Sequence, residues 1–548
     1  MIRDIKKLSA DILDVLVVGG GIHGATIACH AAKAGYHTAI IDKNDFCSAT
    51  SANSLKILHG GLRYLQHLNI KRMRHSITAR REMMQLAPHL VEPLPCLMPL
   101  YGKGLRGKKV MQGALFLNDS IGWDRNLDLP AALHIPRGHI ISKQKCLEVI
   151  SGLPTEELHG ASVWYDVLAV NTERLVLEYI LESVNHGAQA ANYVEATAIE
   201  KGADDLYHVT VVDKISHQTS HIKTRFVVNA SGPLFEDHLH SPRQSVSKQK
   251  WALALNIVSR KKIFADYAVA LEGQSSYEDK DALLKRGKRL YFFVPWRGYT
   301  MIGTDYEAGS IHPDCLQIKS DMIHKMVAEI NAIYPPARLT YEDISFYHVG
   351  LLPRHDKADE SNIQLEKNST FCEHKGSHFS RLLSVKGVKY TTAPHIANQI
   401  VGFLKKQWPV TSRGKQSEAS FLNGPWPVND TVVQAMLEEK YGRRARHILQ
   451  FLHSEQDDEI WLDKDAQLLK AEVHYLISDE MAWTLSDIVF RRTGLGTAEC
   501  PEWTLLVKLS EFMAQILGWD EARKEAEREE VLRRYLPLVR KEAKQNKC

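Results

Sequence analysis

The sequence lacks several features that would place it in a special class of protein. No stretch approaches the roughly 20 apolar residues that a membrane-spanning helix needs. Its eight cysteines lie far apart without a C-x-x-C pair, which argues against a zinc site or a disulfide framework and for reduced thiols. Residues 1–14 carry charges throughout and have no apolar signal core. We therefore expect a cytoplasmic protein, with peripheral attachment to the inner face of a membrane left open.

A strong charge of one sign is also missing. The 69 Lys and Arg residues nearly balance the 65 Asp and Glu residues, for a formal charge of +4. The sequence shows no interleaving of aromatic and basic residues, so we expect no nucleic-acid partner. It contains no internal repeat and no group of residues with metal-ligand spacing. At 548 residues, an ordinary globular chain should form at least two domains.

The N-terminal part predicts a βαβ unit. Residues 14–18 form a short apolar run typical of a buried strand, and residues 25–34 are compatible with a helix that closes on Gly35. Residues 38–41 predict a second strand. A strand, a glycine turn, a helix and a strand within about thirty residues indicate two parallel strands joined by a right-handed crossover.

The turn after the first strand has the pattern G-x-G-x-x-G, with glycines at Gly19, Gly21 and Gly24. The first glycine permits a tight turn, the second lets the backbone approach a pyrophosphate, and the third allows close packing of the helix on the sheet. Asp42 follows the second strand, about twenty positions on, where a carboxylate binds ribose hydroxyls. The pattern predicts a dinucleotide site but does not decide between FAD and NAD.

Further along, the pattern predicts helices over residues 72–86 and 175–185. Residues 92–125 contain several prolines and glycines and are expected to be irregular. Residues 207–212 suit an antiparallel sheet on the substrate side, and residues 225–230 suit a buried strand. Past a linker rich in Pro, Ser, Gly and Lys, the pattern is almost wholly helical up to a charged tail.

Residues 50–65 resemble the flavin-facing segment of the FAD-dependent, aerobic glycerol-3-phosphate dehydrogenases. Other motifs of that family follow in the same order, among them residues 87–89, 164–166, 173–175, 229–233, 302–305, 382–385, 391–392, 471–473, 480–482 and 491–496. The resemblance extends over most of the chain and implies FAD as the cofactor.

The resemblance implies an α/β fold with three parts. These are a Rossmann-type FAD-binding domain like that of glutathione reductase or D-amino-acid oxidase, an antiparallel-sheet substrate domain, and a C-terminal helical domain. The first two would interleave within residues 1–408, with FAD-binding pieces near 10–90, 160–245 and 345–408 and substrate pieces near 91–159 and 246–344. A linker at 409–427 would lead to the helical domain at 428–548.

The resemblance also implies which residues lie along the FAD: Ser51, Ser54, Lys56, His59, Gly60, Gly61, Leu62, Ala230, Gly232, Gly387, Lys389 and Thr391. Glycine at 60 and 61 would let the backbone lie against the flat flavin ring. Residues 386–392 would close over the pyrimidine end of the flavin, where a cation tunes its electronics.

In the family that the chain resembles, hydride passes from C2 of sn-glycerol 3-phosphate to flavin N5 and yields dihydroxyacetone phosphate. The electrons then pass to a membrane quinone or to oxygen. A base must take the hydroxyl proton, and cations must hold the phosphate. Arg63, Tyr64 and Lys389 match family positions near the substrate.

Other positions near the substrate depart from the family pattern. Leu352 takes the place of a phosphate-binding arginine, with Arg354 on the other side of the proline, and Lys367 replaces a second arginine. A lysine keeps the charge but loses the bidentate fork of arginine. Asn256 stands where the family has a histidine that is a candidate base. Asparagine cannot act as a base, so His348 and His59 become the candidates.

Three functions remain open on these residues. The first is a glycerol-3-phosphate dehydrogenase with a rearranged phosphate pocket. The second is a relative that oxidises another polyol phosphate or hydroxylated substrate, and the third is a flavin-binding protein without turnover.

Two segments are candidates for contact with a lipid surface. Residues 523–530 predict a solvated helix, and their continuation at 531–540 alternates apolar and basic residues in a way that suits anionic lipid. Residues 103–109 form a second basic stretch. The resemblance is also compatible with a homodimer.

Overall fold

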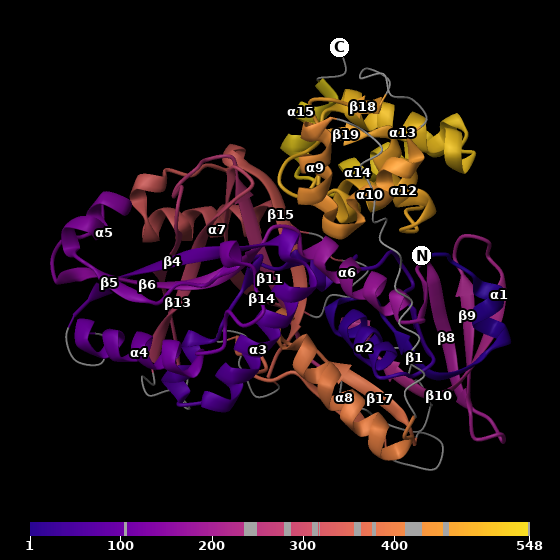
Figure 1. Cartoon of the computed structure of the whole chain (residues 1–548). Coiled ribbons are helices and arrows are strands. Elements are labelled where there is room, and N and C mark those ends of the chain that lie inside the picture. Colours follow the sequence, from indigo (N-terminus) through magenta and orange to yellow (C-terminus); the bar gives the residue numbers. More distant parts are fainter. Residues whose placement is uncertain are drawn as a thin grey trace.

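The computed structural model of the chain describes residues 1–102, 107–234, 249–278, 286–309, 316, 318–355, 363–374, 380–410, 430–452 and 460–545. It contains two large β-sheets side by side and a C-terminal helical region that lies above their junction (Figure 1). The predicted fold class, a Rossmann-type FAD-binding fold with a second sheet and a C-terminal helical region, is confirmed.

The first sheet has eight strands, six of them in the order β16-β17-β10-β1-β2-β7. The strands β17, β10, β1, β2 and β7 are parallel, whereas β16 pairs with β17 in the antiparallel sense. A hairpin of β8 and β9 joins the sheet through β10. The strand bounds are β1 Ile12–Val18, β2 Thr38–Ile41, β7 Gln189–Ala191, β8 Val194–Lys201, β9 Tyr207–Asp213, β10 Thr219–Asn229, β16 Thr370–Glu373 and β17 Leu382–Lys386.

The strand β1 is buried on both faces, which explains its continuous apolar sequence. Val15 and Val17 pack into a core shared with helices α2 (Ile22–Lys33), α6 (Thr172–Asn185) and α8 (Ala393–Gln407). Leu16 and Val18 face the opposite core, which is closed by helix α1 (Ile5–Ala10) and the β8–β9 hairpin.

The antiparallel strand expected at residues 207–212 exists as β9, but its expected place in a substrate-side sheet is wrong. It pairs with β8 and β10 and therefore belongs to the first sheet. The alternation of apolar and polar residues in β9 indicates that one face of the strand is buried. It does not indicate which sheet the strand joins.

The second sheet has nine strands, eight of them in the order β15-β11-β14-β13-β12-β4-β6-β3, and β5 pairs with β6. All neighbours are antiparallel except β12 and β4. Helix α7 (Ser320–Ile333) packs against β12. The strand bounds are β3 Ile57–Leu58, β4 Val91–Tyr101, β5 His139–Ile141, β6 Leu158–Ala169, β11 Trp251–Ser259, β12 Ala268–Glu278, β13 Arg286–Trp296, β14 Tyr299–Gly309 and β15 Ile344–Pro353.

The expectation of an irregular segment at 92–125 is wrong, because β4 and helix α4 (Lys108–Ile121) occupy most of it. Pro93, Pro95 and Pro99 all sit at alternate positions of β4. Their missing N–H groups therefore face the same side, and β4 pairs with β6 along nearly its whole length but with β12 only at two residues. Prolines on the less paired side of a strand do not interrupt its other hydrogen bonds.

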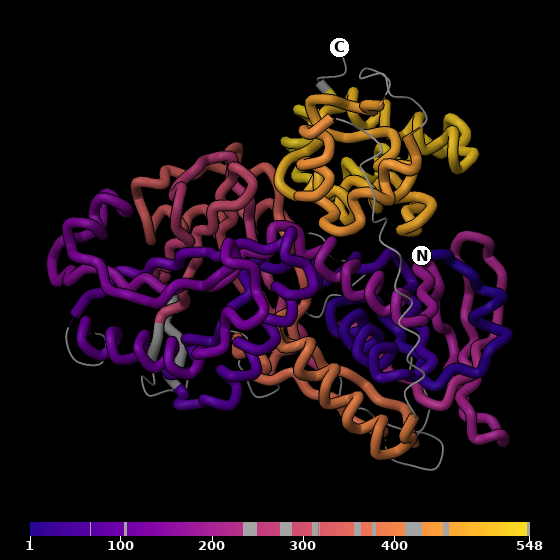
Figure 2. The backbone as a smooth tube through the Cα atoms, in the orientation of Figure 1, coloured from indigo at the N-terminus to yellow at the C-terminus, as the bar shows by residue number. Residues whose placement is uncertain are grey.

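Other helices match their predicted ranges closely, with α3 at Ile70–Leu86 and α6 at Thr172–Asn185. The C-terminal region contains the helices α9 Thr431–Tyr441, α10 Ala445–Ile448, α12 Lys470–Ser478, α13 Trp503–Leu517, α14 Glu521–Leu532 and α15 Pro537–Gln545, with the short strands β18 Trp461–Asp463 and β19 Leu468–Leu469. A π-helical turn at Asp487–Arg492 precedes α13. Figure 2 follows the backbone of this region, which shares one hydrophobic core with the second sheet. From residue 411 on, the predicted linker lies outside the described residues.

The expectation that residues 531–540 could lie on lipid is wrong. Val531, Leu532, Leu536 and Val539 are all buried in the core of the C-terminal region. The segment contains the end of α14, a turn and the start of α15, and its apolar residues pack on the protein. Of the other basic candidate, residues 103–106 lie outside the described part, and Lys108 and Lys109 are exposed at the start of α4.

Candidate cofactor and active site

A cavity of about 2670 Å³ runs between the two sheets and reaches the C-terminal region. The carboxyl ends of β1, β2 and β10 form one end of it, and residues of β11, β13, β14 and β15 form the other. Its lining includes Gly19, Gly21, Asp42, Ser51, Ser54, His59, Gly61, Leu62, Arg63, Tyr64, Ala230, Gly232, Asn256, Leu352, Lys367, Gly387, Lys389 and Thr391. The tertiary structure thus brings most of the predicted site residues into one space.

The glycines of the first turn are required by close backbone packing. Gly19 has φ +107°, and a Cβ there would lie 2.6 Å from the carbonyl oxygen of Ala230. A Cβ on Gly24 would lie 1.8 Å from the carbonyl oxygen of Gly19. Gly24 therefore lies behind the cavity lining and lets α2 begin at Ile22 with its N-terminus at the turn. Ser51 Oγ accepts a hydrogen bond from the Ile22 main-chain nitrogen at 2.9 Å.

Asp42 closes the same end of the cavity. Its Oδ2 accepts a hydrogen bond from the Gly20 nitrogen at 2.6 Å, and its Oδ1 accepts one from the Asn44 nitrogen at 2.8 Å. Burial raises the pKa of this carboxyl group to about 6, and the two main-chain donors oppose that rise. The carboxylate is thus fixed at the end of β2, where a dinucleotide would present its ribose.

His23 was not among the residues predicted for the site, although it stands inside the glycine motif. Its ring packs on Gly387, where a Cβ would lie 2.6 Å from ring atoms. Burial lowers the pKa of His23 to about 4, so the imidazole is neutral near pH 7. Its Nε2 is buried and has no hydrogen-bond partner among the described residues. His23 lines the cavity as a neutral residue, but this Nε2 is buried behind that lining.

The reason for glycine at position 60 differs from the expected one. A Cβ on Gly60 would lie 2.5 Å from the guanidinium of Arg80, and Gly60 itself does not line the cavity. Gly61 does line it, with φ +95°. The first glycine makes room for a buried arginine, and the second gives the turn its conformation.

His59 and Asp166 form a hydrogen-bonded pair at the cavity. His59 Nδ1 lies 2.9 Å from Asp166 Oδ2, which also accepts a hydrogen bond from Trp164 Nε1. Asp166 Oδ1 accepts hydrogen bonds from the Gly60 nitrogen at 2.6 Å and from Arg80 at 3.0 Å. Burial acts to raise the pKa of Asp166, but the hydrogen bond and charge of His59, together with Arg80, lower it to about 2.

The His59 side chain is 46% exposed, which leaves its Nε2 open to the cavity. Among the described residues no hydrogen bond to this nitrogen is present. Asp166 fixes the ring orientation and stabilises a protonated imidazole, which is the arrangement of a general base held by a carboxylate. Trp164 and Asp166 stand in one of the motifs that matched the family, but nothing in the sequence pairs them with His59.

Tyr64 and Lys389 form a second pair in the cavity. Lys389 Nζ donates a hydrogen bond to the Tyr64 hydroxyl at 2.8 Å, and Arg72 stacks on the Tyr64 ring. Burial lowers the pKa of Lys389, while Tyr64 partly opposes this shift. Burial acts to raise the pKa of Tyr64, but the charge and hydrogen bond of Lys389 lower it. Arg63 and Lys367 add two more cationic side chains to the lining.

Lys56 and His348, both predicted for the site, are buried away from the cavity. Lys56 is 0% exposed, and its Nζ donates to both carboxylate oxygens of Glu173 at 2.9 Å. The expectation that Lys56 lies along the FAD is therefore wrong for its side chain, which forms a buried ion pair. His348 is 1% exposed, and its Nε2 lies 3.1 Å from the Thr497 carbonyl oxygen. Burial holds the pKa of His348 well below its ordinary value, and the expectation that it is the base is wrong.

Arg354 takes another role than the expected one, whereas Asn256 lies at the cavity as expected. Arg354 is buried and is absent from the cavity lining, so the expectation that it contacts the substrate is wrong. Asn256 lines the cavity, but its Nδ2 donates to the Asn53 carbonyl oxygen and its Oδ1 accepts from Thr304 Oγ1 at 2.7 Å. With both ends bound to protein, Asn256 holds β11 to its neighbours.

The chemistry of this site fits a flavin dinucleotide. The close-packed glycines and the N-terminus of α2 suit a pyrophosphate, and Asp42 suits a ribose. His23 and Lys389 line the space beyond them. The fold and the site therefore define a flavin-dependent oxidoreductase with a Rossmann-type cofactor domain.

Comparison with known proteins places the chain in a family. Residues 14–397 match the FAD dependent oxidoreductase family, and residues 410–524 match the C-terminal domain of alpha-glycerophosphate oxidase. The chain belongs to the FAD dependent oxidoreductase family, and FAD is its cofactor, as the resemblance implied.

Several relatives cover nearly the whole chain. A glycerol-3-phosphate dehydrogenase of Synechocystis is 27% identical over 544 residues, which are 95% of each chain. An aerobic glycerol-3-phosphate dehydrogenase of Staphylococcus aureus is 26% identical over 554 residues, covering 96% of this chain and 95% of that one.

A solved structure confirms the fold over the same length. The glycerol-3-phosphate dehydrogenase from Bacillus halodurans, complexed with FAD, superposes with a TM-score of 0.69 at 22% identity. The match covers 97% of this chain and 96% of that one.

Among the described residues, no helix is both long and apolar enough to cross a membrane.

Proposed function

We propose that the enzyme oxidises sn-glycerol 3-phosphate to dihydroxyacetone phosphate. The relatives that span the whole chain carry the name of this activity. The observation that carries the proposal is the pairing of His59 with Asp166 in the same cavity as Arg63, Lys367 and Lys389. A substrate with a hydroxyl group and a phosphate needs one base and several cations, and this cavity supplies both.

His59 is the proposed base. Its Nε2 accepts the proton of the substrate hydroxyl as the bond from carbon to hydrogen breaks, and the buried carboxylate of Asp166 stabilises the imidazolium that results. Bound FAD supplies the acceptor for the hydride from the substrate carbon. Lys389 and Tyr64 form a positive, hydrogen-bonded wall that can orient the substrate oxygen.

The phosphate is held by Arg63 and Lys367 in this proposal. One charge-assisted hydrogen bond is worth about 1.5–3 kcal/mol, so two cations are enough to bind a phosphate without the arginine that Leu352 replaces. A lysine in place of an arginine loses directional binding, since the Lys367 ammonium acts as a point charge and cannot form the two parallel hydrogen bonds of a guanidinium.

The test follows the visible absorption of the bound flavin under anaerobic conditions while sn-glycerol 3-phosphate is added. Rapid, stoichiometric bleaching is the expected result. No bleaching at millimolar substrate, with dithionite still reducing the flavin, would contradict the proposal.

A second candidate is oxidation of a different polyol phosphate or hydroxylated substrate. Leu352 and Lys367 favour it, because both line the cavity where the family has arginines. A panel of polyol phosphates of increasing length, scored by kcat/KM for flavin reduction, separates the two candidates. A substrate other than sn-glycerol 3-phosphate with a kcat/KM about 10-fold higher would establish the second.

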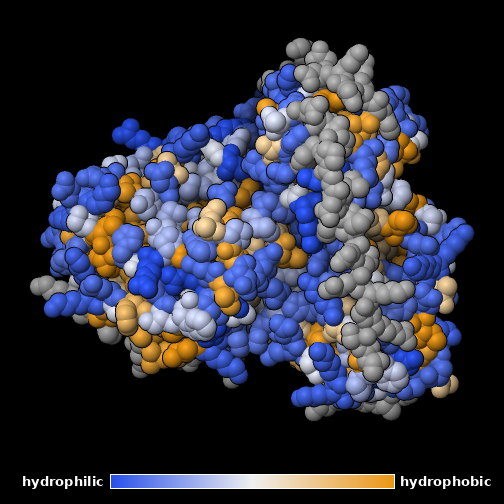
Figure 3. All heavy atoms as spheres, in the orientation of Figure 1, coloured by the Kyte–Doolittle hydropathy of each residue, from blue (hydrophilic) through white to orange (hydrophobic). Residues whose placement is uncertain are grey.

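The electron acceptor is proposed to be a quinone reached at a membrane surface. In support, α4 and the turn after it expose Val110, Phe116, Leu117, Trp123 and Leu127, with Phe116 71% and Trp123 78% exposed. Figure 3 shows hydrophobic surface over the end of the molecule where α4 lies. Lys108 and Lys109 border this patch and would add attraction to anionic lipid. Sedimentation with anionic and with neutral vesicles tests the contact, and loss of binding in Phe116→Ser with Trp123→Ser is expected.

The division of the chain into an interleaved FAD and substrate domain at 1–408 and a helical domain at 428–548 is likewise proposed. The separation of the two sheets and the helical composition of the C-terminal region support it. Limited proteolysis should cut first between residues 409 and 427.

A homodimer is also proposed, and the mass of the holoenzyme in solution tests it.

A further inference from the structure

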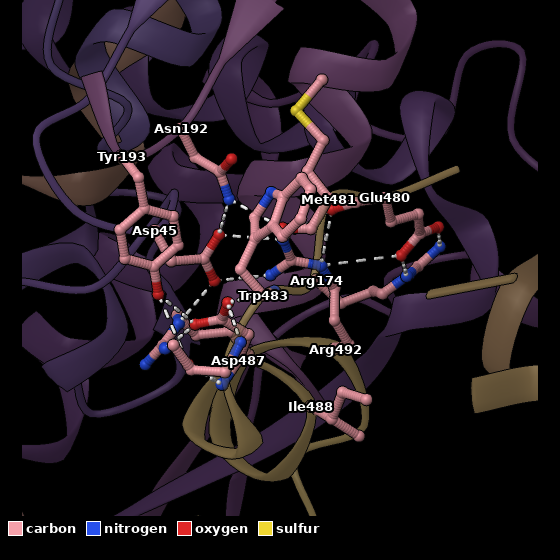
Figure 4. Close-up of polar contacts among 12 residues, drawn as sticks. Asp45, Arg174, Asn192, Tyr193, Glu480, Met481, Trp483, Asp487, Ile488 and Arg492 are labelled. Atoms are coloured by element: carbon pink, nitrogen blue, oxygen red, sulfur yellow. Dashed lines mark hydrogen bonds and ion pairs between the residues drawn. The ribbon is translucent and has the colours of Figure 1, made fainter. Parts of the chain in front are cut away.

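A buried cluster of charges joins the C-terminal region to the segment that follows β2 (Figure 4). Asp45 lies at its centre and is 1% exposed. Arg492 donates to both Asp45 oxygens, at 2.7 and 2.8 Å, and Arg491 Nε donates to Asp45 Oδ2 at 2.6 Å. Both arginines belong to the π-helical turn of the C-terminal region, more than 440 residues away in the sequence.

The strand next to β2 is tied to the same cluster. Asn192, just after β7, donates from Nδ2 to Asp45 Oδ1 and to the Met481 carbonyl oxygen, each at 2.8 Å. The Tyr193 hydroxyl donates to Asp487 Oδ1 at 2.7 Å, and the same oxygen accepts a hydrogen bond from Arg491. The segments after β2 and after β7 therefore both attach to the C-terminal region, as the dashed lines in Figure 4 show.

The segment that carries Asp45 also builds the cofactor cavity. Asp42 and Asn44 line the cavity with Asp45, and the Asn44 carbonyl oxygen accepts a hydrogen bond from the Tyr193 nitrogen at 3.0 Å. The Cys47 nitrogen donates to the Gly20 carbonyl oxygen at 3.0 Å, and the Gly20 nitrogen donates to Asp42. Asp45 thus lies in a short loop whose two ends are both hydrogen-bonded to the glycine turn.

The buried charges of the cluster stabilise one another, so the loss of one charge destabilises the others. Burial acts to raise the pKa of Asp45, but Arg492 and Arg491 lower it, so the carboxylate is ionised. Removing the charge of Asp45 leaves two buried arginines short of a partner, which is far more destabilising than breaking a surface pair. The loop between Asp42 and Cys47 would then lose its anchor on the C-terminal region.

We propose that Asp45 is a positioning residue for the cofactor: the C-terminal region, through Arg491 and Arg492, holds the loop that presents Asp42 to the ribose of FAD. FAD retention and docking of the C-terminal region are therefore coupled, and by reciprocity bound FAD tightens that docking. This inference rests on FAD as the cofactor and not on the identity of the substrate, so its test needs no substrate.

The test measures FAD release from the holoenzyme on dilution, by the fluorescence of free FAD, in Asp45→Asn. This variant keeps the size and removes the charge, and an increase of roughly 10-fold in the dissociation constant of FAD is expected for a coupling of ordinary size. Hydrogen–deuterium exchange of residues 40–48 in the holoenzyme should become faster. FAD release and exchange at residues 40–48 both respond to the position of the loop, which a measurement of overall stability would not isolate.

Glu178→Gln is the matched control. Glu178 is also a buried carboxylate that contacts an arginine of the C-terminal region, Arg444, but it lies on α6 and does not line the cavity. The substitution Glu178→Gln should lower the melting temperature of the holoenzyme. It should leave FAD release and hydrogen–deuterium exchange at residues 40–48 unchanged.

Two results would overturn the proposal. One is wild-type FAD retention in Asp45→Asn, and the other is equal FAD loss in Asp45→Asn and Glu178→Gln, which would mean that only overall domain docking matters. Should Asp45→Asn fail to fold, Tyr193→Phe removes a single hydroxyl from the same cluster. It is expected to weaken FAD retention about 5-fold, at the low end of ordinary coupling, and unchanged retention in that variant would equally overturn the proposal.

Discussion

His59 Nδ1 and Asp166 Oδ2 lie 2.9 Å apart, although the two residues are separated by 107 positions in the sequence. Asp166 also binds Gly60 and Arg80, so the carboxylate has a fixed orientation before any substrate arrives. A histidine whose Nδ1 is held in this way presents Nε2 as the acceptor for a proton. The same carboxylate thus shapes the glycine turn and orients the proposed base.

The first prediction concerns that carboxylate. Asp166→Asn should lower kcat by about 10²- to 10⁴-fold, because the amide does not stabilise a protonated His59. The rate is expressed per bound flavin, because Asp166 also binds Gly60 and Arg80 and its loss can lower the FAD content as well. Stopped-flow flavin reduction measures the effect. Asp124→Asn is the control, because Asp124 is a buried carboxylate paired with Arg74 and Arg81 and does not line the cavity. An equal loss of rate in the control would rule out a specific role for Asp166.

The second prediction concerns the phosphate pocket. Leu352 lines the cavity, and the resemblance described above implies an arginine at this position in the family. If sn-glycerol 3-phosphate is the substrate, Leu352→Arg should lower its KM by about 10-fold, the effect of one added charge-assisted hydrogen bond. Leu352→Gln controls for polarity without charge. A KM that rises in Leu352→Arg would instead favour a substrate that the natural leucine fits.

The third prediction concerns packing at the cofactor. Gly387→Ala should weaken FAD binding and destabilise the holoenzyme by about 1–3 kcal/mol, because a methyl group would press on the His23 ring. His23→Ala combined with Gly387→Ala removes the clash and should recover most of the lost stability. Thermal unfolding of Gly387→Ala, His23→Ala and the double variant gives the coupling energy. Additive effects in the double variant would show that the two residues do not meet.

The fourth prediction concerns pH and Asp42. In the apoprotein burial raises the pKa of this group to about 6, from an ordinary value of 3.8. A carboxyl group with a raised folded-state pKa favours the fold in its protonated form, and this contribution is lost as the pH rises from about 4 through about 6. The stability of Asp42→Asn apoprotein relative to wild-type apoprotein should therefore rise between about pH 4 and about pH 6, because the asparagine does not titrate. Thermal unfolding across this range provides the measurement, and a constant difference at all pH values would contradict the assignment.

The dinucleotide end of the site could be predicted because its residues are neighbours in the chain. Gly19, Gly21, Gly24 and Asp42 all belong to one βαβ unit, whose strand and helix ranges nearly match the predicted ones. Local sequence is sufficient there, since the glycine spacing, the strand, the helix and the acidic residue all fall within one short stretch of chain.

Which side chains face the cavity was decided by the tertiary structure. Lys56 and His348 have the right chemistry for a site, but Glu173 and Thr497, which come from other elements, hold them in the interior. The sequence records that a residue is polar, whereas its partner depends on which elements pack against it.

The sequence by itself determined the βαβ unit, the glycine turn and the likeness to a family of flavin enzymes, because each depends on residues close together or on their order. The His59–Asp166 pair, the neutral His23 against Gly387 and the Asp45 cluster were decided only by the fold. They join residues that are 107 to 447 positions apart, and no local pattern specifies which distant segments will meet. Pairing and burial of such groups follow from the assembly of the two sheets with the C-terminal region, which is a property of the whole chain.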